Sequence, residues 1–495
     1  MAEPNAKKTD EKPAPLKVDA KDNLVETKHT VTIGGKEIKY TVTTGTMVLK
    51  EETADSAKES EGEKPKVQIF FIAYTKDGGK DKSKRPLTFS FNGGPGSSSV
   101  WLHLGLLGPR RVVQEFDGSL PRPPYQLTDN EFSLLDETDL VFIDPVSTGY
   151  SRAVEGQKPV EYHGFKKDIE SVGDFIRLYT TRYQRWLSPK FLIGESYGTT
   201  RAAGLSGYLY DRHGMMLNGI MLISSVLDFA TLDFAFGNDI PYIMYLPGYA
   251  ATAWYHDALP GKHETLQNLL DEVEEFALGQ YATALLKGDM LTPEEHAVVA
   301  EKLSRYTGLS QQFIERSNLR IKDQHFFKEL LRERGLTVGR LDSRLIGMDR
   351  SGVTEQPESD PLLDAVLAPY TAGFYHYVRA ELKFESDLPY EILSSRVHPW
   401  SFKEFEGQAV YVAETLRKAM TVNPHLKVFV ANGYYDLGTP YFATEYTFNH
   451  LGLHESLRGN LSMAYYDAGH MMYIHMPSLE AMKRDLAEFI QSAMP

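Results

Sequence analysis

Cysteine is absent from all 495 positions of the sequence. Disulfide bridges, thiolate metal sites and a cysteine nucleophile are therefore excluded. Long apolar runs are absent as well: none reaches the roughly 18 residues of a transmembrane helix, so we expect no membrane span. Residues 1–23 are polar and lysine-rich and lack an apolar h-region, so we expect no signal peptide in this sequence.

Positive charge is in the minority, with 53 Lys and Arg residues against 67 Asp and Glu residues and a formal net charge of -14. This acidity argues against nucleic acid or an anionic membrane as the main partner. The motif H-E-x-x-H is also missing, so we expect no catalytic zinc and no other metal. The length suffices for two domains, or for one domain with a large insertion.

The N-terminal region divides into a polar lead and two β-rich stretches. We expect residues 1–27 to be a disordered lead. Residues 29–49 and 67–75 are rich in β-branched and aromatic side chains and predict strands, and Gly34-Gly35 suits a hairpin turn in the first stretch. The charged residues 52–66 between them predict an exposed loop.

From residue 86 onward, short apolar segments alternate with longer amphipathic stretches. This pattern is typical of buried parallel strands with helices on both faces of a sheet. The predicted strands are 86–91, 139–144, 190–194, 219–226, 427–432 and 461–467. Apolar residues spaced three and four apart predict a final helix over 479–493.

Residues 230–395 break this alternation and have a helical pattern. Within them, Thr292-Pro293-Glu294-Glu295 reads as a helix start, with Thr as N-cap and Pro at the first position. Because this stretch lies between two groups of strands, we interpret it as a helical cap. The sequence thus predicts an α/β fold whose mostly parallel sheet comes from two parts, residues 28–229 and 396–495, around that insertion.

The pentapeptide GESYG at 194–198 follows a predicted strand and precedes a helix-compatible stretch. This is the context of a nucleophile elbow, a strained turn that exposes the Ser196 oxygen at the carboxyl end of the sheet. A structural glycine-rich turn is the alternative. The strand before the pentapeptide favours the elbow.

An elbow serine needs a base, and the base needs an orienting carboxylate. In hydrolases of this kind the chain order is serine, acid, histidine. Asp436 follows the predicted strand 427–432, and His470 follows the strand 461–467. Both residues therefore belong to the sheet edge where Ser196 emerges, whereas most other histidines lie in helical or charged stretches.

The loop NGGPG at 92–96 follows the strand 86–91. A tetrahedral oxyanion needs two backbone N–H donors. One comes from the residue after the nucleophile, Tyr197, and the second usually comes from a glycine-rich loop after an earlier strand, which is where NGGPG stands. A phosphate-binding loop is the alternative, but neither G-x-x-x-x-G-K-[ST] nor G-x-G-x-x-G is present.

Five motifs follow one another along the chain: NGGPGSSS at 92–99, DLVFIDPVSTGYS at 139–151, GESYG at 194–198, NGYYD at 432–436 and AGHM at 468–471. With them, the chain resembles the serine carboxypeptidase family of α/β-hydrolases, in its bacterial-type branch. The resemblance implies an α/β-hydrolase fold with a variable helical cap and no cofactor.

The resemblance also implies a role for each site residue. Ser196 is the implied nucleophile, His470 the general base and acid, and Asp436 the carboxylate that orients His470. The N–H groups of Gly94 and Tyr197 are the implied oxyanion hole. The residues implied to bind the free C-terminal carboxylate of a peptide are Asn92, Gly93 and Glu195.

Glu195 gives the implied activity a pH dependence. An ionised Glu195 repels a substrate carboxylate, whereas a protonated one donates a hydrogen bond to it, so we expect activity to favour acidic pH. The chain departs from the family at Leu106, where the family has a second glutamate. Arg110 and Arg111 follow closely and offer another way to pair with a carboxylate.

The resulting hypothesis is a serine carboxypeptidase that acts on peptides with a free C-terminus. We expect a periplasmic or secreted location from the family's habits and the absence of cysteine, and the sequence does not indicate the oligomeric state. Two alternatives stay open: an esterase or acyltransferase with the same machinery, and an inactive binding protein.

Overall fold

The computed structural model describes residues 20–52, 62–79, 81–261 and 263–494. Most of the predicted lead and of the predicted charged loop lies outside these ranges. The described strands are β1 (Asn23–Ile33), β2 (Lys36–Glu52), β3 (Glu63–Lys76), β4 (Leu87–Phe91), β5 (Arg110–Val112), β6 (Leu127–Asp129), β7 (Asp139–Ile143), β8 (Arg152–Ala153), β9 (Lys190–Ser196), β10 (Gly219–Ser225), β11 (Thr337–Val338), β12 (Ile346–Gly347), β13 (Lys427–Gly433) and β14 (Leu461–Tyr466).

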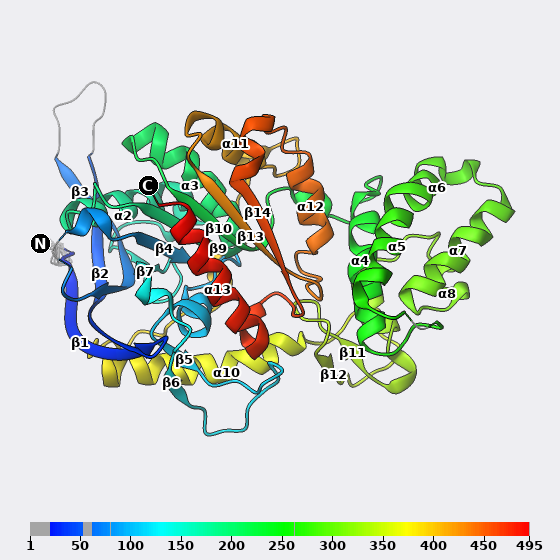
Figure 1. Cartoon of the computed structure of the whole chain (residues 1–495), viewed down its shortest axis with the longest axis horizontal. Coiled ribbons are helices and arrows are strands. Elements are labelled where there is room, and N and C mark those ends of the chain that lie inside the picture. Colours follow the sequence, from blue (N-terminus) through cyan, green and yellow to red (C-terminus); the bar gives the residue numbers. More distant parts are fainter. Residues whose placement is uncertain (1–19, 53–61, 80, 262, 495) are drawn as a thin grey trace, which may run out of the picture.

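A ten-stranded sheet forms the centre of the molecule (Figure 1). Its order is β1-β2-β3-β7-β4-β9-β10-β13-β14, with β8 paired to β3. The six strands from β7 to β14 in this order are parallel, whereas β1, β2, β3 and β7 pair antiparallel. All six parallel strands coincide with predicted ones, so the predicted mostly parallel sheet is confirmed.

The N-terminal strands form the predicted hairpin, in which Ile33 pairs with Lys36 across Gly34 and Gly35. Both glycines have positive φ, 55° and 74°, which such a tight turn requires. The predicted lead extends too far, because β1 already begins at Asn23, which pairs with Thr46 of β2. Backbone pairing with β2 along the whole of β1 orders these polar residues.

The helices are α1 (Val100–Leu102), α2 (Phe165–Arg182), α3 (Tyr197–His213), α4 (Ile240–Tyr255), α5 (Leu266–Phe276), α6 (Ala282–Lys287), α7 (Pro293–Thr307), α8 (Gln311–Arg316), α9 (Asp323–Glu329), α10 (Pro361–His376), α11 (Ala413–Val422), α12 (Tyr441–Asn449) and α13 (Met476–Ser492). The final helix and the start of α7, where Thr292 and Glu295 form a capping box, are as predicted. Within the described ranges, no helix is both long and apolar enough to cross a membrane.

Helices cover both faces of the sheet. Side chains of α2, α3 and α11 share one hydrophobic cluster with the sheet, and side chains of α1, α10 and α13 share another on the opposite face. The strands β7, β9, β10 and β13 contribute side chains to both clusters: in β9, Phe191 and Ile193 face one cluster and Leu192 faces the other. Burial on both faces explains why these strands are continuous apolar runs.

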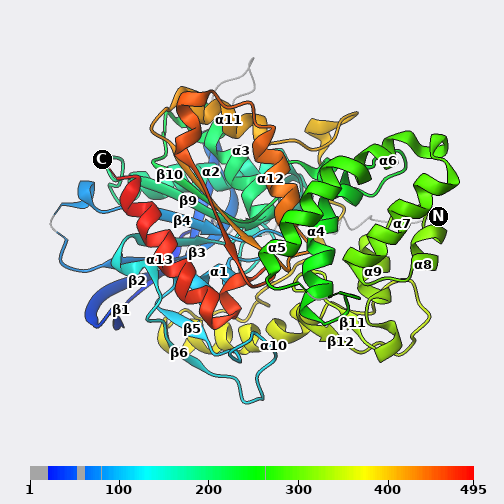
Figure 2. The same ribbon diagram turned by 45° about the vertical axis from the view of Figure 1, so that its right-hand side comes forward.

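The segment predicted as one helical cap, 230–395, divides in two by its packing. Helices α4 to α9 surround a third hydrophobic cluster and lie beside the sheet domain (Figure 2). Helix α10 instead packs on the sheet domain, where Tyr370 and Phe374 are buried. The domain boundaries at 229 and 395 stay a prediction.

Candidate active site

The elbow lies at the junction of β9 and α3. Ser196 ends β9 with φ 60° and ψ −130°, a backbone conformation that is strained for any side chain. A Cβ on Gly194 would lie 2.2 Å from the carbonyl oxygen of Gly198, and a Cβ on Gly198 would lie 2.8 Å from that of Phe91. Both glycines are therefore needed for the strand and the helix to meet in this tight turn.

The NGGPG loop packs directly against the elbow. It follows β4, whose last residue, Phe91, pairs with Gly194 of β9. A Cβ on Gly93 would lie 2.5 Å from the backbone nitrogen of Tyr197 and 2.9 Å from Cβ of Ser196. Gly94 follows with φ 100°, a conformation that favours glycine. The loop thus brings its backbone beside the nucleophile candidate, as an oxyanion hole requires.

Asp436 and His470 follow the adjacent strands β13 and β14 and form a buried pair. Nδ1 of His470 lies 2.7 Å from Oδ2 of Asp436. Oδ1 of Asp436 accepts from the backbone nitrogens of Gly438 (2.8 Å) and Thr439 (3.0 Å), and Oδ2 also accepts from Oγ1 of Thr439 (2.7 Å). Because a carboxylate only accepts, Nδ1 of His470 donates, which leaves Nε2 as a base.

His470 and Ser196 belong to the same edge of the sheet. Ser224 of β10 donates from Oγ to the carbonyl oxygen of His470 at 2.7 Å, and the next residue, Ser225, pairs with Ser196. No hydrogen bond between the side chains of Ser196 and His470 is present in the described structure. Such bonds are often long before substrate binds.

The electrostatic surroundings of His470 favour its charged form. Burial lowers the pKa of His470, but the charge and hydrogen bond of Asp436 and the charge of Glu195 outweigh burial, so the pKa lies above its usual value. A histidine with a raised pKa holds the proton that it takes from a nucleophile more firmly, as a general base and acid does.

Glu195 is enclosed, with 4% of its surface exposed. The Tyr473 hydroxyl donates to its Oε2 at 2.6 Å. Burial raises the pKa of Glu195 to about 7, although the charge of His470 and the side chains of Tyr473 and Asn92 favour the ionised form. Glu195 therefore changes its protonation near neutral pH. No motif in the sequence predicted Tyr473 as a residue of this site.

The positions near Leu106 do not supply a second carboxylate. Leu106 is buried in the hydrophobic cluster of its face of the sheet. Arg110 forms ion pairs with Asp129 (2.7 Å) and Glu381 (2.9 Å) instead of reaching Glu195. The partner of Glu195 in this chain is thus a tyrosine hydroxyl.

Asn92 is fixed through its backbone and its side chain. Its Oδ1 accepts from the backbone nitrogen of Leu102 (3.1 Å), and its carbonyl oxygen accepts from Arg201 (2.6 Å), which is completely buried and paired with Asp168 (2.8 Å). The side chain of Asn92 favours the ionised form of Glu195, but its Nδ2 makes no well-formed hydrogen bond with any described residue. This donor faces the carboxyl of Glu195.

One histidine pair, His450 and His454, has the spacing of metal ligands. Each ring is hydrogen-bonded locally, His450 to the Tyr446 carbonyl and His454 to Ser456. In the described part of the chain, no group of three or more potential ligands is placed to hold a metal ion.

Three comparisons with known proteins bear on this site. The sequence profile of the serine carboxypeptidase family matches residues 59–475. The pheromone-processing carboxypeptidase KEX1 of Saccharomyces cerevisiae is 34% identical over 162 residues, which are 31% of this chain and 20% of that protein. Serine carboxypeptidase-like 33 of Arabidopsis thaliana is 32% identical over 143 residues, 26% of each chain. The chain thus spans only a fifth to a third of the length of the curated relatives it matches.

Among solved structures, the crystal structure of the prohormone-processing carboxypeptidase KEX1 from Saccharomyces cerevisiae superposes with a TM-score of 0.56. The superposition covers 91% of both chains at 16% sequence identity. It confirms the predicted α/β-hydrolase fold. The bacterial-type branch stays a prediction.

Proposed function

Because the chain belongs to the serine carboxypeptidase family, we propose that it releases C-terminal amino acids from peptides through an acyl-enzyme intermediate. One observation carries the proposal: a strained elbow serine, Ser196, shares a sheet edge with a buried histidine–aspartate pair at 2.7 Å. These are the parts of acyl-transfer machinery.

In the proposed reaction, Oγ of Ser196 attacks the carbonyl carbon of the last peptide bond while Nε2 of His470 takes its proton. The N–H groups of Gly94 and Tyr197 stabilise the resulting oxyanion. His470 then gives the proton to the leaving amine, the C–N bond breaks and an ester with Ser196 remains. Water, deprotonated by His470, hydrolyses that ester and releases the shortened peptide.

We propose that Asn92, Gly93 and Glu195 bind the C-terminal carboxylate of the substrate. The Nδ2 donor of Asn92, beside the enclosed carboxyl of Glu195, supports this assignment. Binding of the substrate carboxylate requires protonated Glu195, and a pKa of about 7 keeps Glu195 largely protonated at acidic pH. Catalysis also requires neutral His470, so we expect a bell-shaped pH dependence of kcat/KM with a falling alkaline limb near pH 7.

Paired substrates test the proposed function. Assayed from about pH 4 to pH 8, the range of glutamate and histidine titration, an N-blocked dipeptide with a free C-terminus should be hydrolysed fastest between the acid limb set by His470 and the alkaline limb set by Glu195, while its C-terminal amide is not hydrolysed. Above the pKa of Glu195, KM for the free acid should rise. Glu195→Gln, which keeps a hydrogen-bond donor at every pH, should remove this rise. Equal cleavage of acid and amide would refute carboxylate recognition.

Substitution of Tyr473 is a second test of the proposed carboxylate-binding role of Glu195. The Tyr473 hydroxyl favours ionised Glu195, so Tyr473→Phe should raise the pKa of Glu195 and move the alkaline limb of kcat/KM upward by about one pH unit, the size expected for one hydrogen bond to a charged group. Tyr377→Phe is the matched control, because the Tyr377 hydroxyl contacts Tyr74 at 3.0 Å in another part of the core. An alkaline limb at the same pH in Tyr473→Phe and wild type would contradict the role of Tyr473.

An esterase or acyltransferase is the second candidate, favoured by Leu106 at the position of the family's second glutamate. Hydrolysis of simple esters without cleavage of free-acid peptides would select it. Failure of a fluorophosphonate to label Ser196 would instead indicate an inactive binding protein. The proposed location is periplasmic or secreted, which fractionation of cells that produce the protein tests.

A further inference from the structure

A short segment of the insertion runs between the two loops that carry Asp436 and His470. It comprises residues 340–344 and connects β11 to β12, and we refer to it as the brace segment. Asp342 and Ser343 are completely buried in it, and Arg344 is 8% exposed. Such burial of charged and polar side chains requires specific partners.

The brace segment contacts the loop of His470 at three points. The backbone nitrogen of His470 donates to the carbonyl oxygen of Leu341 at 2.6 Å. The backbone nitrogen of Gly469 donates to Oδ2 of Asp342 at 3.2 Å, and Arg344 donates to the carbonyl oxygen of Asp467 at 2.9 Å. A Cβ on Gly469 would lie 2.4 Å from Cβ of Asp342, so the close approach of Asp342 requires this glycine.

The same segment contacts the loop of Asp436 on both sides of that residue. The backbone nitrogen of Leu437 donates to the carbonyl oxygen of Arg340 at 2.9 Å. The carbonyl oxygen of Tyr435 accepts from the backbone nitrogen and Oγ of Ser343, at 3.0 Å and 3.1 Å. The immediate chain neighbours of Asp436 are therefore both held by the brace segment.

The brace segment is itself fixed by buried contacts. Asp342 and Arg344 form an ion pair of 2.7 Å with a second bond of 3.0 Å. Helix α4 and the residue that follows it also contact the segment: Oγ1 of Thr252 lies 2.6 Å from Oγ of Ser343, and Nε2 of His256 lies 2.7 Å from the Ser343 carbonyl oxygen. The segment thus links the loops of His470 and Asp436 to the neighbouring helical layer.

We propose that the brace segment is a positioning element that holds the His470–Asp436 pair in reactive geometry relative to Ser196. The inference rests on the proposed roles of His470 and Asp436, but not on carboxylate recognition. Acyl transfer requires the base within hydrogen-bond reach of the nucleophile, and a displacement of about 1 Å can lower the rate about 100-fold. The two loops bind the same five residues, so loss of the ion pair loosens both at once.

The double substitution Asp342→Leu/Arg344→Met tests the proposal. Replacing both partners of a buried ion pair by apolar side chains often preserves stability, whereas removing one leaves an unpaired charge. Ester hydrolysis and fluorophosphonate labelling are the readouts, because neither requires the residues proposed to bind the substrate carboxylate. We expect kcat and the labelling rate to fall by about 10-fold to 100-fold, with KM within about threefold of wild type.

The pH profile separates positioning from a general structural role. The charged groups that act on His470 are Asp436, Glu195 and Arg340, and Asp436 and Glu195 raise its pKa. A His470 displaced from Asp436 loses that contribution, so the acid limb of kcat should move to lower pH in the double variant.

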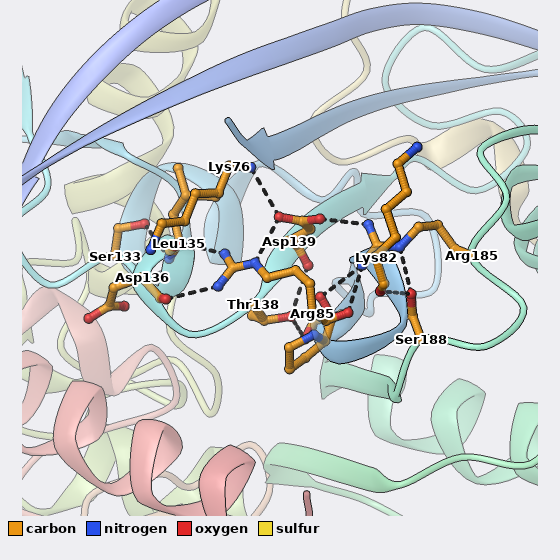
Figure 3. Close-up of polar contacts among 12 residues, drawn as sticks. Lys76, Lys82, Arg85, Ser133, Leu135, Asp136, Thr138, Asp139, Arg185 and Ser188 are labelled. Carbon is orange, nitrogen blue, oxygen red and sulfur yellow. Dashed lines mark hydrogen bonds and ion pairs between the residues drawn. The ribbon is translucent and has the colours of Figure 1, made fainter. Parts of the chain in front are cut away.

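A matched control is the buried pair Asp139–Arg185, at 2.6 Å, which also binds Arg85 (Figure 3). Asp139 is the first residue of β7, at the sheet edge opposite to the end of β9. Asp139→Leu/Arg185→Met leaves Arg85 bound to the carbonyl oxygens of Leu135 and Asp136, and this variant should keep the wild-type kcat and acid limb. A brace variant with wild-type kcat, or equal losses of kcat in both double variants with unmoved acid limbs, would overturn the proposal.

Two further outcomes are informative. If the double variant does not fold, Asp342→Asn keeps the side-chain volume and is measured in the same way, and wild-type kcat with an unmoved acid limb there would also overturn the proposal. If wild-type protein hydrolyses esters but no free-acid peptide, the carboxypeptidase proposal fails while the test of the brace segment proceeds unchanged.

Discussion

Ser196→Ala is expected to lower kcat/KM by about 10⁴-fold to 10⁶-fold, the range found when a serine hydrolase loses its nucleophile. Alanine cannot form the acyl-enzyme, and only the oxyanion loop and substrate binding remain. The side chain of Ser196 makes no hydrogen bond with the described residues, and its φ of 60° is as strained for alanine as for serine. We therefore expect Tm to stay within about 2 °C of wild type.

Ser225→Ala is the matched control for Ser196→Ala. Ser225 pairs with Ser196 across β10 and β9, and its buried Oγ has no hydrogen-bond partner in the structure as described. Its loss should leave both stability and turnover at wild-type levels. Fluorophosphonate labelling should disappear in Ser196→Ala and persist in Ser225→Ala. Retained peptide or ester hydrolysis by Ser196→Ala would rule out Ser196 as the nucleophile.

The sheet and the order of the site motifs could be predicted because their physical causes are local. A strand buried on both faces must be apolar at successive positions, as Leu192 and Ile193 of β9 are. The elbow needs glycine at Gly194 and Gly198 because backbone atoms approach within contact distance. Such requirements leave a pattern in a few consecutive residues, which sequence reasoning can detect.

Tyr473 and the brace segment could not be predicted, because their roles depend on partners far away in the chain. The bond from Tyr473 to Glu195 joins residues 278 positions apart. Gly469 stands in the recognised motif AGHM, yet the residue that requires a glycine there, Asp342, lies in the insertion. Isolated polar residues in a non-periodic segment give no signal of what they contact.

Helix α10 illustrates a limit of periodicity itself. An apolar face indicates that a helix is buried, but not which surface covers it. Residues 361–376 therefore appeared to continue the helical insertion. Tyr370 instead packs against Trp101, with ring centroids 5.1 Å apart, on the sheet domain. Only the tertiary structure shows whether α10 packs on the other helices of the insertion or on the sheet domain.

Asp436→Asn is expected to lower kcat by about 10⁴-fold while the fold is retained, as for the corresponding change in serine proteases. The contacts of Asp436 determine which way the asparagine side chain faces. Oδ1 accepts two backbone N–H groups, from Gly438 and Thr439, so the amide oxygen must take this position. The amide nitrogen then faces Nδ1 of His470 and the Thr439 hydroxyl.

This orientation forces His470 into the wrong tautomer. Nδ1 must accept from the amide, so the ring proton moves to Nε2, which can no longer take the proton of Ser196. Loss of the Asp436 charge also lowers the pKa of His470, so the remaining activity should have its acid limb at lower pH than in wild type. Thr439→Val, which removes one bond of 2.7 Å to Asp436 and leaves the carboxylate, should cost less than about 10-fold in kcat. Equal kcat losses in Asp436→Asn and Thr439→Val would mean that Asp436 only supports its loop, whereas the expected difference would identify it as the group that sets the tautomer of His470.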